Sequence, residues 1–186
     1  MASKTSLARR VYETAHLTGT FKLRSGSVSD EYFDKYLLEA DPALLAELAD
    51  ALVALVPERT EVLAGLELGG IPLVTMLSQR TGLPARFVRK KAKEYGTMRL
   101  AEGGEVGGRS VCLVEDVVTS GGAVLTALAE LRAAGAEIDA AVCVIDRQAG
   151  GSDSLRREGV ALLSLFTMAE LKSAAGEPSA QPSKTT

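Results

Sequence analysis

One short segment joins two acids to a loop of hydroxyl and glycine residues. Glu115 and Asp116 follow the apolar run 111–114, and the residues from Thr119 to Ala123 read Thr-Ser-Gly-Gly-Ala. Small residues allow a tight turn, whose backbone N–H groups and two hydroxyls can surround a phosphate where a helix begins. Carboxylates accept hydrogen bonds from sugar hydroxyls and influence a nearby Mg²⁺. The segment predicts a site for a phosphorylated ribose, with an ordinary strand end and capped turn as the alternative.

A second segment concentrates positive charge. Between residues 86 and 99 there are six cations and one acid, Glu94. The cations are Arg86, Arg89, Lys90, Lys91, Lys93 and Arg99. This stretch does not suit a buried core, and a pyrophosphate needs such countercharge. A solvated loop and a nucleic-acid patch are the alternatives, but the net charge of −3 over 186 residues disfavours nucleic acid.

Two further turns carry groups suited to anions. The turn at 67–70, Glu-Leu-Gly-Gly, can present backbone N–H groups, although a glycine turn that begins the next helix explains it equally well. Arg147 follows the apolar run 140–145, and its planar guanidinium suits a carboxylate, with a surface ion pair as the alternative. The single histidine, His16, is expected inside the first helix and away from these segments. A mechanism that needs a histidine base is therefore disfavoured.

These segments need elements that bring them together. Strands are expected over 62–66, 85–88, 111–114, 140–145 and 160–165, and helices over 6–17, from 42 through 55, from the turn at 69–72 to about 81, over 122–134 and over 168–172. Short apolar strands separated by helices are typical of parallel strands buried on both faces. The predicted fold is α/β, a doubly wound, mainly parallel sheet with helices on both faces. Its ligands should bind at the carboxyl ends of the strands, where Glu115, Asp116 and Arg147 are expected to emerge.

Composition limits the class of protein. With 46% hydrophobic residues, the chain can form one domain over 1–173 with its own core. Cys112 and Cys143 lie in apolar runs without zinc-ligand spacing, so both are expected to be reduced. There is no apolar signal segment and no run long enough to cross a membrane, so we expect a cytoplasmic protein without a membrane partner. The polar residues 174–186 are expected to be disordered.

The acids and loop at 115–123 closely resemble the motif that binds phosphoribosyl pyrophosphate (PRPP) in type I phosphoribosyltransferases. The stretch from Phe87 to Gly96 is similar to the mobile catalytic loop of the orotate phosphoribosyltransferases, and Asp146-Arg147-Gln148 matches the same branch. The resemblance covers about 21–171. It implies the fold of that family, with a small N-terminal hood over the base made by about residues 1–36.

The resemblance also implies a reaction and residue roles. The 5-phosphoribosyl group of PRPP would pass to orotate, giving orotidine 5′-monophosphate and pyrophosphate in pyrimidine (UMP) biosynthesis, with Lys93 as the catalytic candidate. The implied PRPP-binding residues are Arg89, Lys90, Lys93, Glu115, Asp116, Val117, Val118, Thr119, Ser120, Gly121, Gly122 and Ala123. The implied pyrophosphate loop is Glu67, Leu68, Gly69 and Gly70. The implied orotate-binding residues are Thr119, Arg147, Arg24 and Phe33.

A cofactor and a partner follow from the same resemblance. Mg²⁺ would be bound through PRPP near Glu115 and Asp116, without a direct protein ligand, and a homodimer would share the catalytic loop. Arg24 and Tyr95 stand where many members carry lysine and histidine. A transferase for another base and a PRPP-sensing regulator are the alternatives. Arg147 argues against the first and Lys93 against the second.

Overall fold

The computed structural model describes residues 3–22, 26–90 and 100–176, and its centre is a six-stranded sheet. The strands, in the order β5-β4-β3-β6-β7-β8, are β5 (Ala101–Glu102), β4 (Ala85–Val88), β3 (Val62–Leu66), β6 (Ser110–Val118), β7 (Glu137–Asp146) and β8 (Ala161–Thr167). All neighbours pair in parallel except β5, which runs antiparallel to β4. The predicted mainly parallel sheet is confirmed.

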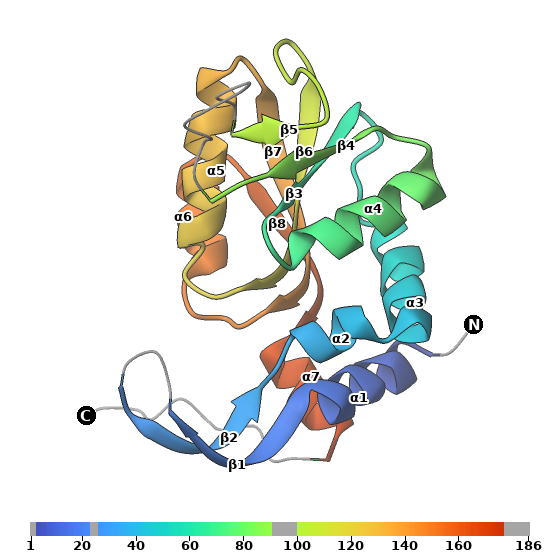
Figure 1. The fold of residues 1–186 in the computed structure, drawn as a ribbon, viewed down its shortest axis with the longest axis vertical. Helices are drawn as coiled ribbons and strands as arrows, with labels where there is room; N and C mark the ends of the chain where they lie inside the picture. Colours follow the sequence, from blue (N-terminus) through green and yellow to red (C-terminus); the bar gives the residue numbers. More distant parts are fainter. Residues whose placement is uncertain (1–2, 23–25, 91–99, 177–186) are drawn as a thin grey trace.

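Helices cover both faces of this sheet (Figure 1). Helices α3 (Pro42–Val53) and α4 (Gly70–Thr81) lie on one side, and α5 (Gly122–Ala133) and α6 (Gly151–Arg157) lie on the other. Successive strand residues serve opposite faces, because Leu63 packs in the core beside α4 whereas Val62 packs in the core beside α5. This is why the strands read as continuous apolar runs rather than as alternating patterns.

Helix α3 begins where the sequence predicted. The carboxylate of Asp41 accepts hydrogen bonds from the backbone N–H groups of Ala43 (2.9 Å) and Leu44 (3.0 Å), and Pro42 occupies the first helical position. These interactions satisfy N–H groups that the helix itself leaves unpaired. Leu44, Leu48 and Leu52 then face the core at helical spacing, as expected.

The N-terminal segment forms a separate layer beneath the carboxyl ends of the sheet in Figure 1. It consists of α1 (Lys4–Ala15), an antiparallel pair of strands β1 (His16–Lys22) and β2 (Val28–Phe33), and the short helix α2 (Tyr36–Ala40). Helix α1 packs against α7 (Met168–Ala174), so the two ends of the described chain lie together. None of the described helices is long and apolar enough to cross a membrane.

Two expectations about these elements were wrong, and some elements were not expected at all. His16 does not lie in the first helix, because α1 ends at Ala15 and His16 pairs with Phe33 as the first residue of β1. Glu115 and Asp116 do not emerge beyond their strand, because β6 keeps its pairing with β7 as far as Val118. The sequence patterns also missed α2, α6 and β5, which are short and depend on tertiary contacts. The residues from 177 onward, most of the expected tail, lie outside the described chain, as do Arg24, Lys93 and Tyr95.

Candidate active site

The glycine turn after β3 packs directly against the acids of β6. Gly69 and Gly70 are both buried, and a Cβ added to Gly69 would overlap Oδ2 of Asp116. A Cβ added to Gly70 would overlap the backbone carbonyl of Val114. The turn contains a cis peptide bond between Glu67 and Leu68. The close approach of two chain segments therefore favours glycine at both positions, and a helix cap alone does not explain it.

Four ionisable side chains converge above this turn. Asp116 is 3% exposed and Glu115 is 7% exposed, which is unusual for carboxylic acids. Glu39 of α2 extends into the same place, since its buried Oε1 would lie 2.7 Å from a Cβ on Gly69. Lys35, between β2 and α2, places Nζ 2.6 Å from Oδ2 of Asp116. The cluster contains three carboxyls and one ammonium.

Burial and nearby charges shift the pKa values of these three acids in different directions. Burial, followed by the neighbouring Asp116, raises the pKa of Glu115 well above its ordinary value. Burial and the charge of Asp116 raise the pKa of Glu39 in the same way. Burial also opposes ionisation of Asp116, but hydrogen bonds from Glu115 and Lys35 outweigh it and hold the pKa of Asp116 below its ordinary value. The stable arrangement is a charged Lys35–Asp116 pair beside two acids that favour their neutral forms.

The hydroxyl-glycine loop connects β6 to α5. Thr119 and Ser120 are exposed, and Gly121 adopts a left-handed conformation (φ 81°) immediately before the helix. The first turn of α6 supports the loop from behind, because the N–H of Gly151 donates to the carbonyl of Thr119 (3.0 Å). The loop therefore presents two hydroxyls and the N-terminus of a twelve-residue helix to an anion.

A cavity of about 260 Å³ joins three of the predicted segments. Glu67 of the glycine turn, Arg89 and Lys90 of the cationic stretch, and Gly122 and Ala123 of the loop all line it. The N–H of Arg89 donates to the carbonyl of Leu100 (2.9 Å), so the residue after β4 is hydrogen-bonded to the residue before β5. The structure thus brings together parts of the chain that are more than 50 residues apart, as the expected site requires.

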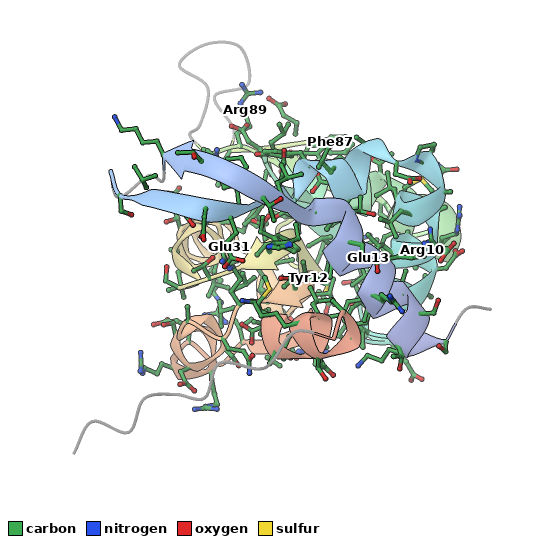
Figure 2. All side chains as sticks on the ribbon, turned by 90° about the horizontal axis from the view of Figure 1, so that it is seen from below. Arg10, Tyr12, Glu13, Glu31, Phe87 and Arg89 are labelled. Carbon is green, nitrogen blue, oxygen red and sulfur yellow. The ribbon has the colours of Figure 1, made fainter. Side chains whose placement is uncertain are left out.

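A second cavity, of about 340 Å³, lies between the N-terminal layer and the end of β7. Arg147 and Phe33 line it, together with Tyr12, His16, Ser29, Glu31, Tyr32, Met168 and Lys172. In Figure 2, Tyr12 and Glu31 lie near the centre of the view, whereas Arg89 and Phe87 lie at one edge. The side chains of Arg89 and Arg147 line different cavities.

Sequence reasoning missed several residues of this second cavity. Nε2 of His16 lies 2.9 Å from Oε2 of Glu31, and the ring of His16 stacks on Tyr12 at 4.7 Å between centroids. The hydrogen bond with His16, helped by Lys172 and Arg147, lowers the pKa of Glu31. The expectation that His16 lies away from the site segments is therefore wrong. Only the fold of the β1–β2 pair brings it beside Arg147, and no local motif marks it.

Lys35 and Glu39 were missed as well. They stand four residues apart at the beginning of α2, a spacing that often forms an ion pair within a helix. Here Lys35 pairs with Asp116 instead. No sequence signal connects these two residues to β6, because the contact spans 81 positions of the chain (116 − 35).

A mainly parallel sheet with paired acids, a hydroxyl-glycine loop and the cations Arg89 and Lys90 near the carboxyl ends of its strands is the arrangement expected of a protein that binds a phosphorylated ribose. The model of the phosphoribosyl transferase domain matches residues 38–158. An orotate phosphoribosyltransferase of a Nocardioides species is 53% identical over 174 residues, which cover 94% of this chain and 97% of that protein.

Solved structures agree with this relationship. A crystal structure of the Mycobacterium tuberculosis orotate phosphoribosyltransferase has a TM-score of 0.82 and 32% identity, covering 90% of this chain and 98% of that one. Another crystal structure of the same protein, in complex with PRPP, has a TM-score of 0.77 and 28% identity over 90% and 98% of the two chains. The chain belongs to the orotate phosphoribosyltransferase family.

Proposed function

We propose that this protein transfers the 5-phosphoribosyl group of PRPP to orotate, producing orotidine 5′-monophosphate and pyrophosphate in pyrimidine (UMP) biosynthesis. The observation that carries the proposal links the two substrate sites. The backbone N–H of Arg147 donates to the carbonyl of Val118, at 2.9 Å. A candidate reader of the orotate carboxylate is thereby joined to the segment that resembles the PRPP motif. The PRPP-bound relative from Mycobacterium tuberculosis supports the same substrate.

The residues suit distinct roles in PRPP binding. Glu115 and Asp116 would accept hydrogen bonds from the ribose hydroxyls, which is why we assign them the sugar rather than a phosphate. The loop from Thr119 to Ala123 would bind the 5-phosphate through N–H groups and hydroxyls, beside Val117 and Val118 of the same motif. The turn at 67–70 would face the pyrophosphate.

The departing pyrophosphate needs positive charge. Arg89, Lys90 and Lys93 would supply it, with Lys93 as the catalytic candidate that counters charge as the bond breaks. Among the described residues, no group of three or more His, Cys, Asp or Glu side chains has a metal-binding arrangement, and Asp116 already faces Lys35. Mg²⁺ would be bound through the oxygens of PRPP, near Glu115 and Asp116. Bound there, it would neutralise charge on the leaving group.

Orotate would occupy the cavity beside Arg147. The guanidinium would bind the carboxylate that distinguishes orotate from uracil, with Phe33, Thr119 and Arg24 as further candidate contacts. The orotate ring nitrogen attacks C1 of the ribose as the bond from C1 to the pyrophosphate oxygen breaks. Closure of the segment that carries Lys93 would exclude water from this step.

We also propose a cytoplasmic homodimer in which the catalytic loop serves the partner's site. Tyr36, Leu37 and Leu68 are exposed apolar side chains next to the carboxylate cluster, which supports an interface there. Cys112 and Cys143 are buried and free, in keeping with a reducing compartment.

The test is a set of parallel reactions with PRPP and Mg²⁺. Loss of orotate absorbance, with uracil, hypoxanthine and adenine unchanged, is the expected result. Turnover of another base instead would overturn the substrate but keep the PRPP site. PRPP binding without turnover of any base would favour a regulator. Lys93→Ala should abolish most turnover, and unchanged turnover would remove Lys93 from the mechanism.

A further inference from the structure

Lys35, which lies outside every motif described in the sequence, forms an ion pair with Asp116. Its Nζ is 2.6 Å from Oδ2 of Asp116, and the side chain of Lys35 is 33% exposed whereas that of Asp116 is 4% exposed. Lys35 belongs to the N-terminal layer, while Asp116 belongs to the central sheet. The ion pair therefore connects the N-terminal layer to the acids of the proposed ribose site.

Local interactions hold Lys35 in this position. The backbone N–H of Asp34 donates to the carbonyl of Ala15 (2.8 Å), and Oδ1 of Asp34 accepts the N–H of Tyr36 (3.1 Å). The ammonium of Lys35 also lies 5.1 Å from the centre of the Tyr36 ring, within the range of a cation–π interaction. Lys35 is thus fixed at an ordered turn, and its direction is set by the backbone on both sides.

Asp116 has a different partner at each of its two carboxylate oxygens. Its Oδ1 accepts the N–H of Val117 (2.5 Å), while Oδ2 lies over Gly69 and faces Lys35. Glu115 and Glu39 crowd the same space, and Lys35 is the cation that faces the three acids in the part of the chain that the structure describes. A buried carboxylate beside two further carboxyls is unfavourable without such a partner. Removing the ammonium would leave Asp116 free to turn or to take up a proton.

The pair also borders the place where a ligand would bind. An ammonium has three N–H donors, and a third of the Lys35 side chain is accessible to solvent. The pair is therefore not an enclosed structural ion pair, and it lies at the edge of β6 that leads into the phosphate loop.

We propose that Lys35 is a positioning residue for ribose recognition: by pairing with Oδ2, it holds the Asp116 carboxylate in the orientation that accepts the ribose hydroxyls of PRPP. This inference rests on the proposed PRPP site. It gives the N-terminal layer a part in PRPP binding, in addition to its expected place over the base.

The experiment measures PRPP binding by isothermal titration calorimetry with Mg²⁺ and without orotate, followed by steady-state kinetics. Lys35→Met should weaken PRPP binding and raise the KM for PRPP by roughly tenfold, the size expected for a charge-assisted hydrogen bond, with the KM for orotate within about twofold of wild type. Lys35→Arg should recover most of the affinity. Lys4→Met is the matched control, because Lys4 also pairs with a carboxylate (Glu170, 3.4 Å) in an exposed position away from these acids.

A double-mutant cycle distinguishes action through Asp116 from direct contact with PRPP. In an Asp116→Asn background, Lys35→Met should have little further effect on PRPP affinity, because the group that Lys35 positions is already lost. A full additional loss would show that Lys35 contacts PRPP itself and would overturn the positioning role. So would unchanged PRPP affinity in Lys35→Met. If Lys35→Met does not fold, Lys35→Gln replaces it in the same cycle. If the wild type itself fails to bind PRPP, the proposed function fails rather than this inference.

Discussion

Gly69 lies directly against the carboxylate of Asp116, so that the turn after β3 and the acid of β6 share one small space. A Cβ at Gly69 would overlap Oδ2 of Asp116 and lie 2.7 Å from Oε1 of Glu39, both of which are side-chain atoms. A Cβ at the next residue, Gly70, would overlap the backbone carbonyl of Val114. The two neighbouring glycines therefore have different roles. Gly69 leaves room for the Asp116 carboxylate, and Gly70 allows the turn to pack against the backbone of β6.

The first prediction separates these two glycines. Gly69→Ala should displace the Asp116 carboxylate, raising the KM for PRPP by roughly tenfold while lowering the free energy of unfolding by about 1 kcal/mol. Gly70→Ala should cost about 3 kcal/mol or more of stability, because a backbone carbonyl cannot rotate away. Urea unfolding and steady-state kinetics measure both effects. A Gly69→Ala variant with the PRPP KM of wild type would show that the position of this carboxylate does not matter for binding.

The second prediction concerns Glu31, a carboxylate in the cavity proposed for orotate. It lies among His16, Lys172 and Arg147, where it neutralises part of the positive charge that a substrate carboxylate would meet. Glu31→Gln should therefore lower the KM for orotate by roughly threefold and leave the KM for PRPP near the wild-type value. Asp30→Asn is the control, since Asp30 is exposed on the same strand and does not line the cavity. An increase in the orotate KM would mean that Glu31 helps to bind the base.

The third prediction concerns stability and pH. Burial raises the pKa of Glu115 in the folded state, so the folded protein holds this proton more tightly than the unfolded chain, whose glutamate pKa is about 4.3. The contribution of Glu115 to stability is therefore fully present below that pH and is lost as the pH rises toward the raised value. Asp116 and Lys35 are the charged groups that act on it.

Glu115→Gln removes this titration. At about pH 4 the free energy of unfolding of the variant should be close to that of the wild type. At about pH 8 the free energy of unfolding of the variant should be higher than that of the wild type by on the order of 2 kcal/mol. Urea unfolding across this pH range measures the stability. Glu130→Gln, at an exposed position on α5, should show no such trend, and a difference for Glu115→Gln that does not vary with pH would contradict the assignment.

The fourth prediction tests the shared catalytic loop. Lys93→Ala and Asp116→Asn should each be nearly inactive, because one lacks the loop cation and the other lacks a ribose contact. If the loop serves the partner's site, a mixed dimer contains one site with both residues intact. An equal mixture, exchanged through mild denaturant, should regain about one quarter of the wild-type activity. Mixtures that stay inactive, although mass spectrometry detects mixed dimers, would place Lys93 in the site of its own subunit.

Local sequence determined the sheet of this protein and the segments that carry its chemistry. The runs at 62–66 and 85–88 form strands with the expected bounds, since short apolar strands buried on both faces are recognisable without knowledge of their neighbours. The acids lie near the carboxyl end of β6, the hydroxyl-glycine loop follows that end, and Arg147 follows β7. They come together because parallel strands have their carboxyl ends on the same side of the sheet.

Tertiary structure decided the surroundings of those segments. His16 leaves the helix to pair with Phe33, and Lys35 reaches across to Asp116, because both positions depend on how the N-terminal layer docks beneath the sheet. The raised pKa values of Glu115 and Glu39 could not be predicted from the sequence either. Burial and the nearby Asp116 raise them, and neither burial nor this proximity is a property of the local sequence. The sequence alone determines which chemical groups lie within a few residues of one another. Desolvation and long-range ion pairs exist only after the chain has packed.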